Sequence, residues 1–123
     1  MDNYDETTNT TFIKKYQLRD GTEKILLEVS PLFDLHISCR NEDHKGWFII
    51  STFDYTGKLE ANRDNWLPLE NEIFALRMDG SKMVHHLVHH RSRRYTAVTP
   101  DSDKSIYWAE THATISRSAK KIC

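Results

Sequence analysis

Two stretches of the sequence resemble each other, and this repetition limits the folds that the chain can adopt. The first is YQLRDGTEKILLEV, which starts at Tyr16, and the second is FALRMDGSKMVHHLV, which starts at Phe74. Each contains two β-prone runs separated by an Asp-Gly pair, with Leu-Arg before that pair and Lys after it. Asp-Gly between β-prone runs favours a β-hairpin, because the tight turn needs a positive φ angle that glycine accepts without steric cost. The sequence therefore predicts the same hairpin twice, with Gly21 and Gly80 at equivalent turn positions.

Other short runs along the chain also predict strands. Residues 33–39 alternate apolar and polar side chains, which is typical of a half-buried strand. Residues 47–55, WFIISTFDY, are the most apolar run and the best candidate for a central strand. A helix over residues 69–90 is an alternative, but the Asp79-Gly80 pair in its middle disfavours it. The predicted fold class is therefore all-β with antiparallel strands.

The order of these elements predicts the domain organisation. A hairpin, a strand opened by a histidine and an apolar strand are followed by a second hairpin and a second strand opened by a histidine. A repeated four-stranded antiparallel unit of ~40–50 residues is the blade of a β-propeller, so we expect about two blades of an incomplete propeller. The expected parts are a flexible N-terminus (1–11), the outer hairpin of one blade (12–30), one full blade (31–90), a connector (91–105) and the inner strand of the next blade (106–123).

Three segments carry a resemblance to a known repeat family: NEIFALRMDGS, HHRSRRY and YWAETHATISRSAKKIC. They resemble the blades of TolB-like β-propellers (WD40-like repeats), especially the branch that includes oligogalacturonate-lyase-type proteins. The inner strand of such blades reads H-x-x-x-S-x-D-G. Here His112 and Ser116 match this pattern, whereas Ser118-Ala119 replaces the Asp-Gly pair. The segment LHISCRNEDHKGWFIISTF, which contains His36, is similar to the same unit.

The resemblance implies a ligand site in the central channel of the propeller. In oligogalacturonate-lyase-like enzymes a metal, a Mn-like divalent transition ion, lies in this channel and is held mainly by histidines. His36 and His112 open the two inner strands and are the candidate metal ligands or channel-lining residues, with Glu110 nearby. A metal site needs three or four converging ligands. The alternative is therefore that both histidines only hydrogen-bond backbone at the channel wall.

A second group of histidines lies in the segment VHHLVHH. On a helix these residues would have the i, i+4 spacing of metal ligands, but on the expected strand they alternate between the two faces. His89 and His90 would then lie near the channel mouth and are candidates for ligand contacts. The alternative is an exposed outer strand without a ligand.

Arginines and tryptophans supply the remaining candidates for ligand contacts. Arg91 and Arg93 can bind a carboxylate-bearing sugar or a phosphate through bidentate hydrogen bonds, or lie in a solvated connector. Trp66 and Trp108 lie in predicted loops and are candidates for stacking on sugars. Trp47 is expected to pack between blades instead.

Composition excludes several classes of protein. The net charge of -1 does not suit a general polyanion binder, so nucleic acid is not an expected partner. No apolar run of about 18 residues exists, so no membrane span is predicted. The polar, acidic start lacks the features of a signal peptide, which predicts a cytoplasmic protein if the chain is complete and leaves export open if it is a fragment.

Cys39, on the apolar face of its strand, is expected to be a buried small residue.

The energetics of a two-blade chain predict association. Two blades leave large apolar faces and open strand edges exposed, so we expect self-association or packing against the remaining blades of a parent propeller. Three or four copies would make a ring of about six to eight blades. The preferred function is a binding scaffold for carbohydrate or protein. The alternatives are a remnant of a metal-dependent polysaccharide lyase and a small self-contained β-sandwich or barrel that mediates interactions.

Overall fold

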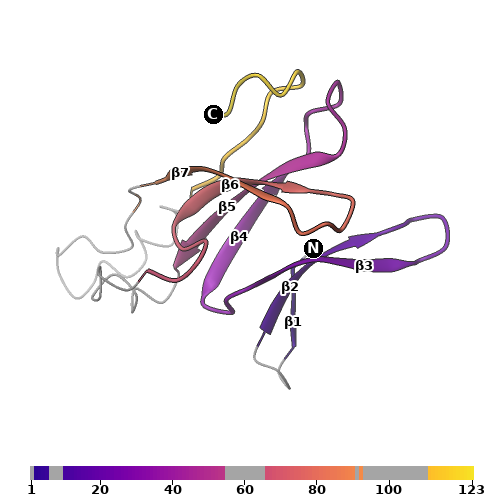
Figure 1. The fold of residues 1–123 in the computed structure, drawn as a ribbon, viewed down its shortest axis with the longest axis horizontal. Coiled ribbons are helices and arrows are strands. Elements are labelled where there is room, and N and C mark those ends of the chain that lie inside the picture. The colour runs from indigo at the N-terminus through magenta and orange to yellow at the C-terminus, as the bar shows by residue number, and fades with distance from the viewer. Residues whose placement is uncertain (1, 6–9, 55–65, 91, 93–110) are drawn as a thin grey trace, which may run out of the picture.

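The computed structural model describes residues 2–5, 10–54, 66–90, 92 and 111–123 (Figure 1). This part of the chain contains strands and turns but no helix, and hence no helix that could cross a membrane. The strands are β1 (Asp2–Asp5), β2 (Thr10–Tyr16), β3 (Glu23–Val29), β4 (Phe33–Ser38), β5 (Trp47–Asp54), β6 (Glu72–Arg77) and β7 (Val84–His89).

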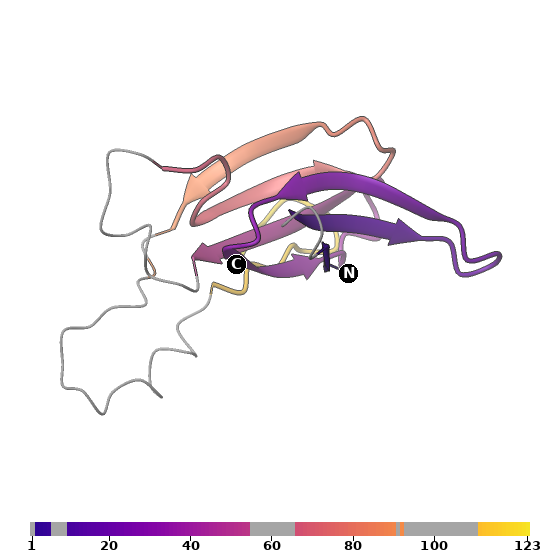
Figure 2. The ribbon, with the colours of Figure 1, turned by 90° about the horizontal axis from the view of Figure 1, so that it is seen from below.

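The strands form two antiparallel sheets, each with its strands in chain order. The three-stranded sheet has the order β1-β2-β3, and the four-stranded sheet has the order β4-β5-β6-β7. Figure 2 shows the β2–β3 hairpin lying along the four-stranded sheet and extending beyond it. The all-β, antiparallel fold class is therefore confirmed. No sheet closes on itself within the described residues.

The main core lies between the two sheets. The three-stranded sheet contributes buried apolar side chains from β2 and β3, and the four-stranded sheet contributes one face of β5 and β6. The buried members of this cluster are Ile13, Leu26, Val29, Phe48, Ile50, Phe74 and Leu76. Alternate residues of a strand share a face, which explains why Phe48 and Ile50 point to the same side. We call this side of the four-stranded sheet its proximal face.

The opposite, distal face of the four-stranded sheet has a smaller core of its own. Ile49 of β5 is buried there with Ala113 and Ile115 of the C-terminal segment, residues 111–123. Ile73 and Ala75 of β6 are half-buried against the same cluster. The four-stranded sheet is therefore covered on one face by an earlier part of the chain and, over its inner half, on the other face by a later part.

Most predicted strands agree with the structure, including the two hairpins. β3 has the predicted bounds, and residues 69–90 form strand, turn and strand instead of a helix. Gly21 and Gly80 both have positive φ, of 72° and 82°. In the first hairpin loop, Gln17 N donates to Thr22 O and Gly21 N donates to Gln17 O, both at 2.8 Å. In the second, Arg77 N donates to Met83 O.

Three expectations are corrected. Residues 1–11 are not uniformly irregular, because Asp2–Asp5 forms β1 and pairs with β2 through its backbone, which requires no apolar pattern. The C-terminal segment contains no strand, only an isolated bridge between Ile115 and Ile122. Cys39 is exposed instead of buried, because β4 ends at Ser38 and its alternation stops there.

Both hairpins share one irregularity. In the first, the register shifts between Ile13 and Lys14, so that Leu26 of β3 is the extra residue of a β-bulge. In the second, the register shifts between Ile73 and Phe74, and Leu87 of β7 is the extra residue. A bulge places two residues of one strand opposite one of the other, and it increases the local twist. The two hairpins therefore also share a backbone irregularity, in a register that matches Ile13 with Ile73 and differs by two positions from the alignment of Tyr16 with Phe74 in the sequence.

Candidate functional site

The two histidines singled out by the sequence lie against each other on the distal face. The rings of His36 in β4 and His112 in the C-terminal segment are stacked, with centroids 4.4 Å apart and planes inclined by 17°. Ser51 holds the peptide on both sides of His112, since its hydroxyl donates to the carbonyl of Thr111 and accepts from the backbone N–H of Ala113 at 3.3 Å. The stack is therefore fixed by the neighbouring strand β5.

A second serine anchors the same segment one rung further along. The hydroxyls of Ser38 and Thr114 are 3.1 Å apart, and the backbone N–H of Ile115 donates to the Ser38 hydroxyl at 3.4 Å. Ser38 is buried. The segment thus exchanges hydrogen bonds with side chains of the four-stranded sheet, while Ala113 and Ile115 supply its apolar contact. Sequence reasoning missed both serines, because a serine inside a strand carries no signal of a partner so distant in sequence.

The described residues do not form a metal site. They contain no group of three or more His, Cys, Asp or Glu placed to hold a metal ion. His36 and His112 supply two imidazoles, and Glu110, the third candidate, lies outside the described residues. A channel metal therefore stays a prediction that depends on further ligands.

The histidines of β7 do not converge on one point. His85 lies against Trp47, with ring centroids 4.6 Å apart. His86 places Nδ1 2.5 Å from a carboxylate oxygen of the buried Glu72. The two neighbours point to opposite faces of the sheet, as strand geometry requires. Each has a partner of its own, which accounts for them without a shared ligand.

His89 and His90 lie at the end of the sheet where β5 ends and β6 begins. His89 meets the ring of Trp66 edge-on at 5.1 Å, and Trp66 is 47% exposed. His90 Nδ1 accepts from the backbone N–H of Ser92 at 3.3 Å, so Nε2 carries the proton and donates to the carbonyl of Thr52 at 2.7 Å. Burial lowers the pKa of His90 below its usual value.

The backbone at this end of the sheet is held by buried polar side chains. The Thr52 hydroxyl accepts from the backbone N–H of Glu72 at 3.0 Å and lies 2.5 Å from the carbonyl of Leu69. Asn71 accepts from the backbone N–H of Asp54 at 3.0 Å. Leu69 and Asn71 have positive φ, of 66° and 47°, and these bonds stabilise that conformation. The chain therefore presents Trp66 from a fixed turn.

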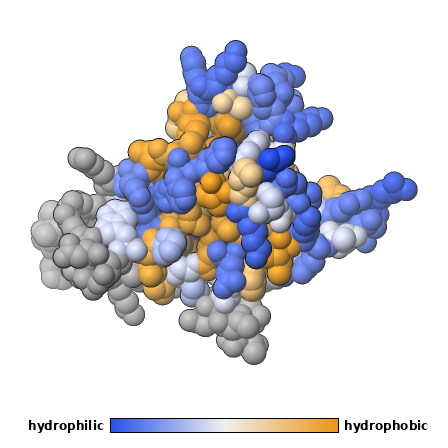
Figure 3. All heavy atoms as spheres, viewed as in Figure 1, coloured by the Kyte–Doolittle hydropathy of each residue, from blue (hydrophilic) through white to orange (hydrophobic). Residues whose placement is uncertain are grey.

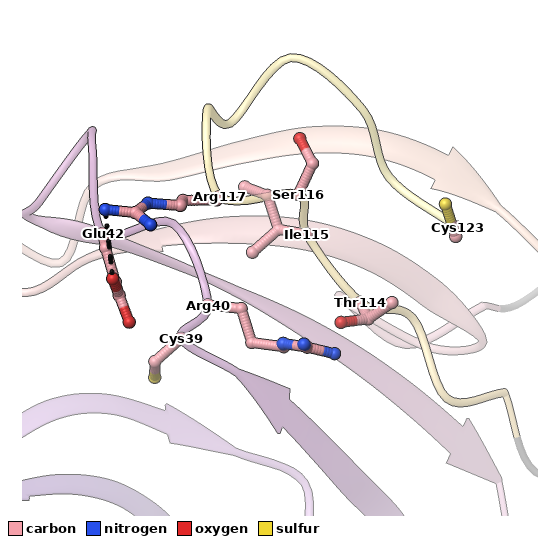
Figure 4. Close-up of a pocket in the computed structure, with 8 residues that line it drawn as sticks. All are labelled: Cys39, Arg40, Glu42, Thr114, Ile115, Ser116, Arg117 and Cys123. Carbon is pink, nitrogen blue, oxygen red and sulfur yellow. Dashed lines mark ion pairs between the residues drawn. The ribbon is translucent and has the colours of Figure 1, made fainter.

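A pocket of about 480 Å³ opens at the other end of the C-terminal segment (Figure 4). Its lining residues are Cys39, Arg40, Glu42, Thr114, Ile115, Ser116, Arg117 and Cys123. Arg117 pairs with Asp43 at 3.1 Å and with Glu42 at 3.7 Å. Figure 4 shows the thiols of Cys39 and Cys123 on different sides of the pocket. Although Cys39 is exposed, partial desolvation beside the pocket raises the pKa of its thiol. Arg117 is thus paired with its two acidic neighbours, and we assign no reaction to this pocket.

The structure thus places some of the sequence candidates and not others. His36 and His112 are brought together. Trp66 lies beside His89, and His90, the next residue after β7, is bound to the carbonyl of Thr52. Four candidates, Arg91, Arg93, Trp108 and Glu110, fall outside the described residues. The structure therefore gives two candidate positions, the His36–His112 stack on the distal face and the Trp66–His89 contact at the end of β7.

Comparisons of this chain with protein-family models, with curated proteins and with solved structures found no match.

Proposed function

We propose that the chain is a β-propeller repeat module that acts as a binding scaffold, and that its ligand contacts the His36–His112 stack and the exposed ring of Trp66. One observation carries this proposal. The four-stranded meander is covered on its proximal face by the preceding sheet and on its distal face by the following segment. Blades of a propeller stack face to face in chain order, which is the same succession.

The position of the two histidines supports the propeller reading further. His36 belongs to the first strand of the four-stranded sheet, and His112 belongs to the segment that follows that sheet. In a propeller, the first strand of every blade lines the central channel, so successive first strands are neighbours. The resemblance to TolB-like blades leads to the same reading, in which both imidazoles face the channel.

The chemistry of the site favours a carbohydrate as the ligand. Trp66 offers an exposed aromatic surface with a polar N–H, a combination that suits partly apolar, partly polar ligands. Hydroxyl groups of Ser92 and Thr111, 2.8 Å apart, lie on the segments that lead to His90 and His112. These groups offer ring and hydroxyl contacts to a ligand, and we therefore propose binding and not catalysis.

Titration of the imidazole signals by NMR tests this proposal. Neutral and uronic oligosaccharides should shift the signals of His36, His112 and His89, whereas His44, exposed in the β4–β5 turn, should not move. Trp66→Ala should weaken binding, and His44→Ala should leave it unchanged. Equal shifts at His44 and His36, or none at either, would refute a carbohydrate site here.

The same signals decide the alternative of a metal-dependent lyase. Addition of Mn²⁺ broadens the signals of nuclei close to a bound ion. Broadening at His36 and His112 that disappears in His36→Ala would favour the lyase remnant over the simple scaffold. Broadening that is uniform over all histidines would indicate no specific site.

A further inference from the structure

The shared bulge sets the register between the two hairpins. Ile13 and Ile73 directly precede the register shift, so they are equivalent positions, as are the bulge residues Leu26 and Leu87. Val29 and His90 are equivalent as well, because they oppose Thr11 and Asn71, both two positions before the isoleucines. This register can be extended to the neighbouring strands.

The register identifies β1 with the second half of β5. Asp2 opposes Ile13 in the three-stranded sheet, and Ser51 opposes Ile73 in the four-stranded sheet. Because Ile13 and Ile73 are equivalent, Asp2 corresponds to Ser51. β1 as a whole, Asp2–Asp5, then corresponds to residues 51–54, with which β5 ends.

The C-terminal residues correspond to the first half of the same strand. Thr114 and Cys123 exchange two backbone hydrogen bonds of 2.9 Å, in the way that Ser38 pairs with Ile49. Thr114 is equivalent to Ser38, since each follows its stacked histidine by two positions and their hydroxyls are in contact. Residues 121–123 therefore correspond to residues 47–49, with which β5 begins.

One strand of the repeat is thus present once intact, as β5, and once as two pieces. The pieces are residues 121–123 and β1, and a single position, that of Ile50, separates them in the register. We propose that two copies of this chain complete the strand. Residues 121–123 of one copy and β1 of the next would lie end to end, between residues 111–116 of the first copy and β2 of the second.

Exposed apolar side chains flank the place where the two copies would meet. On the distal face, Leu87 is 45% exposed and Val88 53% exposed, whereas the equivalent bulge residue Leu26 is buried to 1% by the neighbouring sheet. The free face of the three-stranded sheet exposes Tyr16 and Ile25, 39% and 43% accessible. Figure 3 shows apolar surface between the hydrophilic patches of the molecule. Docking one copy's three-stranded sheet over the other's β7 would cover both apolar faces.

The inferred pairing rests on the proposed propeller architecture, and it predicts which residues of the two copies lie opposite each other. Ile49 opposes Ala75, and Ala75 corresponds to Lys15, so Cys123 of one copy should oppose residue 15 of the next. Directly opposed residues of antiparallel strands have Cα atoms about 4.5–5.5 Å apart, which is within disulfide range. Within one copy, Cys123 and Lys15 belong to segments on opposite faces of the four-stranded sheet.

Disulfide trapping tests the pairing. Lys15→Cys in a Cys39→Ser background should form disulfide-linked oligomers under mild oxidation, and these should return to single chains on reduction. Leu18→Cys in the same background is the control, because Leu18 is 98% exposed at the hairpin tip, away from the joint. Cross-linking of Lys15→Cys at no more than the level of this control would overturn the pairing.

Native mass by light scattering gives an independent readout. The unmodified chain should elute as a discrete oligomer, and Leu87→Asp should shift it to the mass of one chain while Leu18→Asp does not. A monomeric unmodified chain would overturn the head-to-tail assembly. The histidine titration reads the site within one copy, so its outcome distinguishes a failure of the assembly from a failure of the proposed binding function.

Discussion

The hairpins β2–β3 and β6–β7 have the same plan but opposite surroundings. Both contain an Asp-Gly turn with positive φ at the glycine and a bulge with leucine as the extra residue. Leu26 is 1% exposed and Leu87 is 45% exposed. The difference arises because the four-stranded sheet covers the first hairpin, whereas no described residue covers the outer part of the second. Since both positions hold leucine, their difference in burial is set by the neighbouring element.

The side chains follow this difference. β3 carries apolar residues at most of its positions, and two of them, Leu26 and Val29, enter the core. β7 is exposed along almost its whole length. In the shared register His86 takes the place of Ile25, and His90, directly after β7, takes the place of Val29. An exposed outer strand gains little from apolar side chains and is more prone to edge pairing if it has them. Leu87 and Val88 are the exceptions, and they lie on the surface assigned above to a second copy.

The largest expected effect separates the two bulge leucines. Leu26→Ala should lower the free energy of unfolding by about 2–5 kcal/mol, because it leaves a cavity in the main core. Leu87→Ala should lower it by about 0.5 kcal/mol in dilute protein, as is usual for a substitution on the surface. Denaturant unfolding of both variants at low concentration measures the difference.

Protein concentration provides the control for this pair. If a second copy covers Leu87, the cost of Leu87→Ala should rise with protein concentration, because assembly stabilises the folded state by mass action. The cost of Leu26→Ala, in contrast, should stay the same. Equal costs for the two leucines in dilute protein would contradict the comparison of the hairpins.

The two turns should differ by a smaller amount. A Cβ atom at Gly21 would meet no other atom within 4 Å. Gly21→Ala should therefore lower the free energy of unfolding only by the cost of a left-handed backbone at alanine, about 1–2 kcal/mol. At Gly80 a Cβ atom would lie 2.1 Å from Cε of Lys24, whose amine donates to the carbonyl of Asp79 at 2.6 Å. Gly80→Ala should therefore cost about 1 kcal/mol more, the value of a displaced hydrogen bond, in thermal or denaturant unfolding.

A double-mutant cycle isolates the role of Lys24. In a Lys24→Ala background the clash and the hydrogen bond are both absent, so Gly80→Ala and Gly21→Ala should become equally costly. A difference that persists in this background would mean that the turns differ for another reason, such as the additional positive φ of 59° at Lys82.

Local signals in the sequence predicted most of the fold. Period-two alternation and Asp-Gly pairs are properties of a few consecutive residues, and the strands that show them agree with the structure within two or three residues at each end. β1 was missed because a polar edge strand owes its existence to backbone pairing with β2, which leaves no apolar pattern. The C-terminal segment was overestimated, because side-chain hydroxyls of Ser38 and Ser51 bind its backbone where a strand was expected.

The candidate site was predictable only in part. The repeat placed His36 and His112 at equivalent positions, and the structure stacks them. Neither composition nor spacing indicated that His85 would lie against Trp47 or that His86 would meet Glu72, because these contacts depend on the exact register of β7 against β6 and β5. A slip of one residue in the register would move every side chain of the strand to the other face of the sheet and so change all of these contacts.

The smallest expected effect concerns pH and compares His90 with its equivalent Val29. Burial lowers the pKa of His90 in the folded chain below that in the unfolded chain, so the unfolded state binds more protons as the solution is acidified. The stability gained by keeping His90 neutral is complete above the pKa of the unfolded chain, about 6.5, and is lost as the pH falls toward the lower pKa of the folded chain. The half-exposed position keeps this effect small.

His90→Val should flatten the slope of stability between about pH 7 and pH 5, measured by denaturant unfolding, whereas Val29→Ala should lower stability equally at every pH. An unchanged slope in His90→Val would show that other histidines carry the pH dependence.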